Sequence, residues 1–415
     1  MSHSPARSTT PARSGATLRK LVAPFCVGLF AVTLILDLSV TGEQQFVHLA
    51  RSFLAGELHF LEKPGSWADT VPFEGRHYWP LGPAPALLLV PFVWAADPVG
   101  FPFRQGHLQP LLVALALLLC FRIARQTGYS RDDSVCLALG FTYATAFLGV
   151  AMWPWGWYFS HVLTGVLVLA TICEFTGRRR YWLLGLLCGL TLATRFTASF
   201  GIGWIALHLL LDRERREARW KALACLLLPY LTALALLLGY NEARFGNPFE
   251  QGYATQLIPP HATKARDYGL FSLVHLPGNL YYFLLAAPVP VLRDGLSRVL
   301  TFPWVAGNPW GMSVLVTSPC LLFLLGLRFR DRTSRLLLLT SAAIAAPLLL
   351  YYGVGFRQYG YRYSLDFLPF LYYLLLRNYR EQRGELSDRF RATVLVSAAT
   401  NLYLFAGHFL PLLAR

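Results

Sequence analysis

The chain has few charged residues. Only 14% of its 415 residues are charged, whereas about 25% is usual for a soluble domain. The hydrophobic share is 55% and the mean hydropathy is +0.44. This composition excludes an ordinary water-soluble enzyme and predicts a protein that crosses a membrane several times.

Lysine is scarce as well, since only four of the 37 basic residues are lysines. Basic residues exceed the 22 acidic ones and give a net charge of +15. They gather in short clusters between apolar runs, where the positive-inside rule expects them, and not in a patch suited to nucleic acid. We therefore expect no nucleic-acid partner.

Clustered metal ligands are missing. The seven cysteines all lie in apolar stretches and form neither a CxxC motif nor a Cys/His array. This pattern indicates neither a disulfide framework nor a zinc site. His48, His59 and His77 share one polar segment without the spacing of metal ligands. We expect no cofactor, and no spacing indicates a divalent metal ion, although a requirement for one stays open.

The apolar runs predict an all-α polytopic membrane protein with about eleven transmembrane helices. Residues 1–20 carry four bases and no acid, which is typical of a cytoplasmic N-terminal tail. Residues 21–411 show no soluble domain, low-complexity region or repeat, so we expect one membrane domain. The expected crossings are 21–40, 107–120, 134–152, 160–175, two short spans within 182–211, 222–240, 310–327, 336–352, 361–377 and 392–411.

Residues 81–96 are apolar but contain three prolines, which favours an interfacial or partly inserted helix over a crossing. A crossing here would also place most of the basic clusters outside. The segments 41–106 and 241–309 are then both extracytoplasmic, and 279–290 is a second interfacial stretch. We expect the functional face to be the extracytoplasmic face, in a bacterial inner membrane.

The first outer segment begins TGEQQFVHLARSFLAGELHF. Thr41 and Gln44 have the spacing of a capping box, which predicts a helix with Glu43 in its first turn. The helix dipole would keep that carboxylate ionised, so that it could act as a general base or bind a cation. The alternative is an interfacial amphipathic helix without chemistry.

This layout resembles the superfamily C glycosyltransferases, which include protein O-mannosyltransferases and lipid A aminoarabinose transferases. The matching features are Gly42–Glu43, the AGEL step at 55–58, the run GRHYWPLGPAP at 75–85 and Arg195 between two short spans. The resemblance covers the layout of residues 30–240. The chain departs from the family pattern with glutamate in place of the usual aspartate, and with Gln44 where many members have a second acid. It also lacks a lysine before the paired prolines.

The resemblance implies an inverting hexosyl- or pentosyltransferase that moves a sugar from a polyprenyl-phosphate donor to an extracytoplasmic glycan, lipid or protein. Membrane lipid and the lipid-linked sugar are the expected partners. Glu43 would be the catalytic base. The remaining candidates are Asp69 as a second catalytic acid, Arg195, Arg357 and Arg362 for the donor phosphate, and His77, Tyr78, Arg244 and Asp366 for substrate binding.

Each of these candidates also has an interpretation without chemistry. Arg195 interrupts about thirty apolar residues, which is costly unless its guanidinium meets an anion or snorkels to the interface. Asp69 suits a turn. Arg362 and Asp366 would be neighbours on a helix and would neutralise each other. The tryptophans in WPWGWYFSH suit an aromatic belt at the interface.

A transporter of lipids or sugar-lipids, or an inactive binding relative, is the alternative function. Transporters often contain internal repeats and broken helices near the middle of the membrane. The sequence shows no repeat, and its polar residues concentrate at one face. This distribution favours the enzyme.

Overall fold

The computed structural model describes residues 12–212, 218–294 and 297–413. Residues 1–11 of the expected tail lie outside the described residues. The α-helices are α1 (Ala12–Ser39), α2 (Gln45–Leu54), α3 (Ala84–Ala96), α4 (Gln105–Gln126), α5 (Arg131–Tyr143), α6 (Phe147–Ala151), α7 (Gly156–Thr176), α8 (Tyr181–Leu192), α9 (Gly201–Leu210), α10 (Arg219–Phe245), α11 (Pro260–Arg266), α12 (Leu276–Leu284), α13 (Val314–Thr317), α14 (Arg332–Leu350), α15 (Leu368–Arg383) and α16 (Asp388–Leu413).

Short 3₁₀ helices and two hairpins complete the fold. The 3₁₀ helices are η1 (Asp97–Val99), η2 (Thr197–Phe200), η3 (Leu273–His275), η4 (Pro319–Gly326) and η5 (Arg362–Asp366). The antiparallel hairpins are β1 (Val71–Phe73) with β2 (Arg76–Tyr78), and β3 (Val289–Leu292) with β4 (Leu300–Ala306). The expectation of a mainly helical chain is met, but it missed both hairpins.

Five helices in the described part of the chain are long and apolar enough to cross a membrane: α1, α4, α7, α10 and α14. The expected crossings within 182–211 and at 361–377 correspond to helices of at most 16 residues, whereas 392–411 lies within the 26-residue helix α16. The expected crossing 134–152 is divided into α5 and α6. The expected crossing 310–327 is an α-turn followed by 3₁₀ helix, because Ser318 precedes Pro319 and leaves the helical region at φ −138°.

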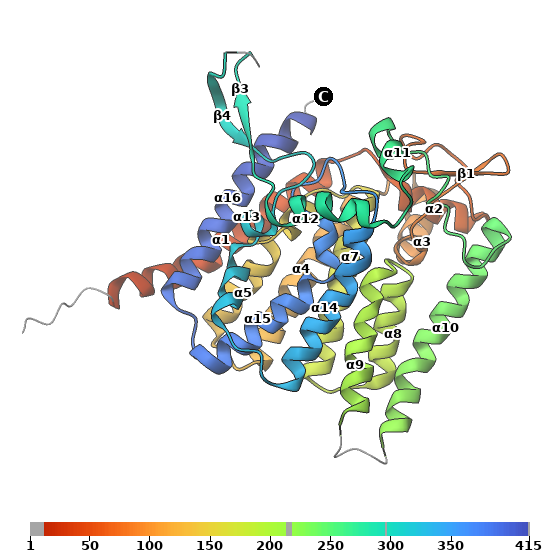
Figure 1. Ribbon diagram of the computed structural model, residues 1–415. Helices are drawn as coiled ribbons and strands as arrows, with labels where there is room; N and C mark the ends of the chain where they lie inside the picture. Colours follow the sequence, from red (N-terminus) through yellow and green to blue (C-terminus); the bar gives the residue numbers. More distant parts are fainter. Residues whose placement is uncertain (1–11, 213–217, 295–296, 414–415) are drawn as a thin grey trace, which may run out of the picture.

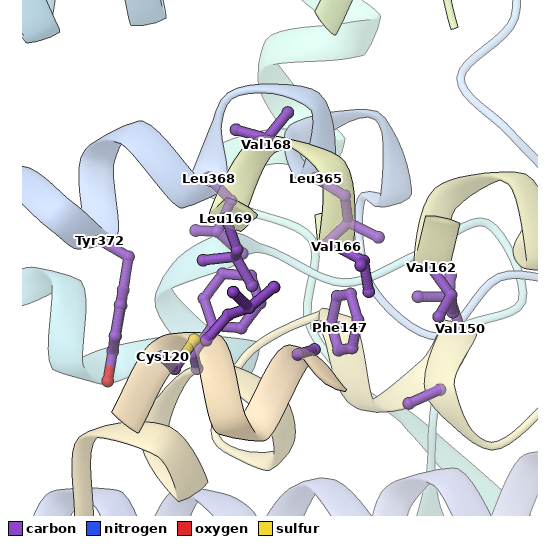
Figure 2. Packing of buried hydrophobic residues seen from close by; sticks show 14 of the residues in the cluster. Cys120, Phe147, Val150, Val162, Val166, Val168, Leu169, Leu365, Leu368 and Tyr372 are labelled. Carbon is purple, nitrogen blue, oxygen red and sulfur yellow. The ribbon is translucent and has the colours of Figure 1, made fainter. Parts of the chain in front are cut away.

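The helices pack around α7, which contacts α4 on one side and α8 on the other. Figure 2 shows side chains of α7, including Val162, Val166 and Leu169, packed among residues of α4, α6 and α15. At the perimeter, α8 and α10 approach closely at Gly185, where a Cβ would lie 2.0 Å from the carbonyl oxygen of Leu226. Small residues permit such close packing of helices in membranes.

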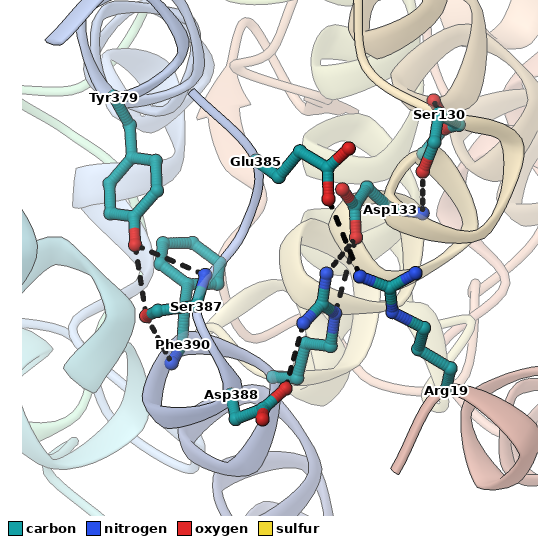
Figure 3. A network of polar contacts seen from close by, with 10 residues as sticks. Arg19, Ser130, Asp133, Tyr379, Glu385, Ser387, Asp388 and Phe390 are labelled. Atoms are coloured by element: carbon teal, nitrogen blue, oxygen red, sulfur yellow. Dashed lines mark hydrogen bonds and ion pairs between the residues drawn. The ribbon is translucent and has the colours of Figure 1, made fainter. Parts of the chain in front are cut away.

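Ion pairs connect α16 and the residues just before it to α5 and α1. The buried guanidinium of Arg391 lies 2.7 Å from Asp133 of α5 and 2.9 Å from Asp388 of its own helix. Arg19 of α1 reaches Glu385, just before α16, at 3.4 Å. Figure 3 shows these acids converging where the three helices meet. The contacts join the beginning and the end of the chain.

The short helices α2, α3, α11 and α12 and both hairpins gather toward one end of the helical bundle (Figure 1). They come from the two segments expected to be extracytoplasmic. In the first hairpin Glu74 and Gly75 both have positive φ, at 48° and 75°, as a two-residue type I′ turn requires. The Glu-Gly pair between alternating residues was therefore a readable hairpin signal.

Candidate active site

A cavity of about 960 Å³ opens among the elements at this end of the bundle. We call it the large cavity. Its walls come from the loop before α2, the start of α7, the turn after α8, the end of α10, the helix α11 and the loop 351–363. Its polar and charged lining includes Glu43, Gln45, Ser66, Asp69, Arg195, Thr197, Asn241, Arg244, Glu250, Gln256, His261, Arg357 and Arg362.

Glu43 lies in the large cavity, but the capping box predicted around it is wrong. The helix begins at Gln45, and Glu43 precedes its N-cap in the left-handed region at φ 54°. The side chain of Gln44 instead donates to the Gly42 carbonyl and accepts the Gln105 N–H. The Glu43 carbonyl accepts the Gly156 N–H at 3.1 Å. The backbone conformation of Glu43 is therefore determined by tertiary contacts with α4 and α7, and not by a local helix cap.

The Glu43 carboxylate is half-buried and has two polar neighbours. Gln45 donates a hydrogen bond to Oε2, and the Ser66 hydroxyl lies 3.4 Å from Oε1. Burial raises the pKa of Glu43 above its ordinary 4.5, and this effect outweighs the hydrogen bond from Gln45 and the attraction of Arg357. A carboxylate whose pKa is raised toward neutral pH is a better general base.

Asp69 faces the same space and is held on several sides. The indole N–H of Trp157 donates to its Oδ2 at 3.0 Å. Its backbone N–H donates to the Leu257 carbonyl at 2.6 Å, and the Gln256 amide donates to its carbonyl at 3.1 Å. Its φ is 65°, and burial raises its pKa. Segment 241–309 thus fixes the left-handed backbone of Asp69, which belongs to segment 41–106.

The aromatic-belt interpretation of WPWGWYFSH is wrong for at least two of the tryptophans. Trp153 is buried in the core, and Trp157 lines the large cavity with its N–H on Asp69. Tyr158 continues this wall and donates its hydroxyl to the Arg357 carbonyl. The run therefore builds the site from the first turn of α7 and does not anchor that helix to lipid.

Arg195 forms a buried ion pair with Asp366. Its Nε and Nη2 lie 2.7 and 3.2 Å from the two carboxylate oxygens, and the Thr197 hydroxyl donates to Oδ2 at 2.5 Å. His161 Nδ1 lies 3.6 Å from Oδ1. The predicted pair of Arg362 with Asp366 is wrong, because η5 has three residues per turn and residues four apart do not face each other.

Arg357 and Arg362 line the cavity near the two acids, and they attract the carboxylates of Glu43 and Asp69 respectively without contacting them as ion pairs. Neither forms an ion pair with any carboxylate in the described part of the chain. The Arg362 guanidinium lies 5.6 Å from the ring centre of Tyr158 and 5.4 Å from that of Tyr363. Arg357 has φ 51°, which makes it the third charged cavity residue in a left-handed conformation. Such backbones are rare outside glycine and gather at functional sites.

Gln358 is the buried residue that shapes the loop carrying both arginines. Its side-chain amide donates to the carbonyls of Trp310 and Val354, each at 2.7 Å, and its Oε1 accepts the Arg362 N–H at 3.3 Å. Gly355, at φ 92°, leaves room for it, because a Cβ there would lie 2.4 Å from Gln358 Oε1. Gln358 was not among the expected site residues.

The expected substrate-binding residues separate in space. Arg244 lines the large cavity and donates to the Trp79 carbonyl at 2.7 Å and to Asn241 at 2.6 Å. His77 stacks on Trp67 at 4.1 Å, and Tyr78 packs on Phe245. Neither of the latter two is among the cavity-lining residues. The hairpin therefore supports the site from outside the cavity.

Other lining residues were not expected. Gln45 and Ser66 contact Glu43, and a group of aromatic side chains, which we call the aromatic wall, also lines the cavity. That group comprises Tyr253, His261, Trp310, Tyr351, Tyr352, Phe356 and Tyr363. Gln45 could have been found from its position two residues after Glu43, whereas the aromatic wall depends on long-range folding. Among the described residues, no group of three or more His, Cys, Asp or Glu could hold a metal ion.

No protein-family model and no curated protein matches the chain. Among solved structures, the crystal structure of the Archaeoglobus fulgidus oligosaccharyltransferase in the apo form matches with 13% identity and a TM-score of 0.48. The match covers 93% of this chain and 56% of that one. The chain therefore spans little more than half the length of that enzyme.

Proposed function

We propose that this protein is an integral-membrane glycosyltransferase that moves a sugar from a polyprenyl-phosphate donor to an acceptor at the extracytoplasmic face of a bacterial inner membrane. The observation that carries the proposal is that two acids and two arginines line the large cavity without forming an ion pair with one another. Glu43 and Asp69, both with raised pKa, share it with Arg357 and Arg362, which lack a carboxylate partner in the described ranges. The sequence resemblance to superfamily C glycosyltransferases supports the same function.

The cavity supplies the groups that this transfer needs. Ionised Glu43 takes the proton of the acceptor hydroxyl as its oxygen bonds to the anomeric carbon. The bond from that carbon to the phosphate oxygen breaks, and the polyprenyl phosphate leaves with the electron pair. A single displacement of this kind inverts the anomeric centre. Arg357 and Arg362 stabilise the leaving phosphate, because guanidinium groups form charge-assisted hydrogen bonds with phosphate oxygens.

Asp69 has a supporting part in this scheme. The negative charge of Asp69 raises the pKa of Glu43 by repulsion. The positive charge of Arg362 attracts the Asp69 carboxylate and lowers the pKa of Asp69. Asp69 is therefore placed to orient the acceptor or to keep Glu43 basic. The aromatic wall offers ring faces on which a sugar can stack. Arg195 contributes less positive charge than the sequence suggests, since Asp366 neutralises it.

The proposal is tested with the full chain in nanodiscs and a panel of radiolabelled polyprenyl-phosphate sugars. We expect the wild type to bind one donor class and to release or transfer its sugar. Glu43→Gln should abolish turnover while donor binding is kept, because the amide cannot accept the proton. Glu62→Gln is the matched control, since Glu62 is an exposed acid of the same segment that does not line the cavity.

The outcomes separate the alternatives. Full turnover in Glu43→Gln would remove this residue as the base. Donor binding without turnover in the wild type, together with movement of the lipid between leaflets, would favour the transporter. Failure to bind any donor of the panel would overturn the proposed donor class.

A further inference from the structure

A second, smaller pocket of about 560 Å³ lies where α4 and α7 end and α8 begins. We call it the basic pocket. Its lining consists of Arg122, Arg125, Gln126, Cys173, Glu174, Gly177, Arg178 and Arg180. The glycosyltransferase proposal makes no use of these residues.

The basic pocket and the large cavity lie at opposite ends of the same helices. Both helices begin beside the loop that carries Glu43. The first residue of α4, Gln105, donates its N–H to the Gln44 side chain, and the first residue of α7, Gly156, donates its N–H to the Glu43 carbonyl. With 22 and 21 residues, these helices are each roughly 30 Å long at 1.5 Å per residue. That length matches the hydrocarbon thickness of a bilayer. The basic pocket is therefore at the level of the lipid headgroups on the other membrane face.

The charge of the basic pocket is largely uncompensated. Its one acid, Glu174, binds Arg180 through both oxygens, at 3.0 and 2.9 Å. No carboxylate of the described residues forms an ion pair with Arg122, Arg125 or Arg178. The positive-inside rule explains why bases occur on this face. It does not explain why they line one pocket between helix ends.

The start of α8 adds hydrogen-bond donors beside the arginines. This twelve-residue helix has Arg180 as its N-cap, no side-chain cap and no acid in its first turn. Glu174 accepts the backbone N–H of Arg180 at 2.9 Å, whereas the N–H groups of residues 181–183 have no acceptor among the described residues. These three groups are left for an external acceptor, and the positive end of the helix dipole favours an anion. An uncapped helix start and a cluster of arginines thus favour the same kind of ligand.

Exposed apolar side chains form a stripe on each of α4 and α8, next to the basic pocket. Leu111, Leu115 and Leu118 of α4 are exposed and recur with Arg122 at helical spacing. On α8 the exposed side chains of Trp182, Leu186 and Leu190 recur four residues apart and begin two residues after Arg180. A ligand with an anionic head at the arginines would therefore find apolar surface below it. This combination matches a phospholipid and not a soluble anion.

We propose that the basic pocket binds the phosphate headgroup of an anionic phospholipid, with the acyl chains lying along α4 and α8. The test is native mass spectrometry of the full chain with phosphatidylglycerol and phosphatidylcholine of matched chain length. Wild type should retain one phosphatidylglycerol in preference. In Arg122→Gln/Arg178→Gln we expect that preference to fall about 10- to 30-fold, as loss of two basic residues near a lipid headgroup predicts.

The matched control is Arg328→Gln/Arg330→Gln, which removes two exposed bases that do not line the basic pocket. Retention unchanged in the control and reduced in the pocket variant supports the proposal. Equal loss in both variants, or no preference in the wild type, overturns it. A separate titration with inorganic phosphate distinguishes the source of the ligand. Pocket-dependent binding of phosphate as tight as that of the lipid would assign a soluble anion and overturn the lipid assignment.

Discussion

Two parts of the large cavity contain arginines in opposite electrostatic states. At one, Arg195 is bound by both oxygens of Asp366 and is buried. At the other, the Arg362 guanidinium contacts the rings of Tyr158 and Tyr363 and the Phe356 carbonyl, and neither Arg362 nor Arg357 forms an ion pair with a carboxylate of the described residues. The comparison teaches that an arginine interrupting an apolar run does not by itself indicate a phosphate site. An arginine is available to a phosphate only where no carboxylate of the protein already pairs with it.

The two states imply different roles. A buried ion pair is costly to break, because removal of one partner leaves the other charge unsolvated. An arginine held by ring faces and backbone retains its charge for a ligand. We therefore expect Arg195 and Asp366 to matter for stability, and Arg357 and Arg362 for donor binding.

The largest effect is expected from Asp366→Ala. It leaves the Arg195 guanidinium buried without its anion, and we expect a loss of about 3–5 kcal/mol in unfolding free energy. The thermal unfolding midpoint in detergent measures the change. Arg195→Leu/Asp366→Leu removes both charges and should recover most of the loss. A single variant as stable as the wild type would show that the pair is not a structural element.

The next largest effect is expected from Arg357→Gln and Arg362→Gln, which test the arginines that form no ion pair. Each removes a charge that has no carboxylate partner among the described residues, so stability should change by less than about 0.5 kcal/mol. Donor binding should weaken about 10- to 100-fold, as the loss of one charge-assisted hydrogen bond predicts. Donor titration and thermal unfolding of the same preparations provide both values. The opposite result, a large loss of stability with unchanged affinity, would assign these arginines a structural role.

Local signals in the sequence identified much of this arrangement. Glu43, Asp69, Arg195, Arg357 and Arg362 were selected from their residue types and positions, and all five line the large cavity. Their chemical roles stay predictions. The main helices were also readable, because an apolar run of sufficient length leaves few alternatives.

Contacts between distant parts of the chain could not be predicted from the sequence. Asp366 was expected to pair with Arg362 because a helix was assumed there, whereas its partner lies 171 positions away in sequence. Similarly, hydropathy could not distinguish α7, whose apolar window is 83% buried, from α10, whose window is 11% buried. Both are equally acceptable as spans, and only packing separates core from perimeter.

A smaller effect is expected from Gln358→Leu, which tests how the unpaired arginines are held. The leucine keeps the volume but loses the hydrogen bonds to Trp310, Val354 and Arg362. We expect kcat/KM for the donor to fall about tenfold, through a lower kcat as well as a higher KM, since the loop mispositions both guanidinium groups that hold the donor and stabilise the leaving phosphate. Combination with Arg357→Gln should be less than additive, because both changes act on one binding element. Full additivity would show that Gln358 acts elsewhere.

The smallest effect is expected in the pH profile of Gln45→Ala. General-base catalysis requires ionised Glu43, so kcat/KM should fall as the pH drops through the pKa of this residue, which burial holds above 4.5. The hydrogen bond from Gln45 stabilises the carboxylate and lowers that pKa. Its removal should therefore shift the acidic limb to higher pH and leave the rate on the plateau nearly unchanged. Trp157→Phe, which removes a donor to Asp69, is the companion variant. If only Trp157→Phe shifts the acidic limb of the kcat/KM profile, then Asp69 and not Glu43 is the titrating base. The two acids would then exchange their assigned roles.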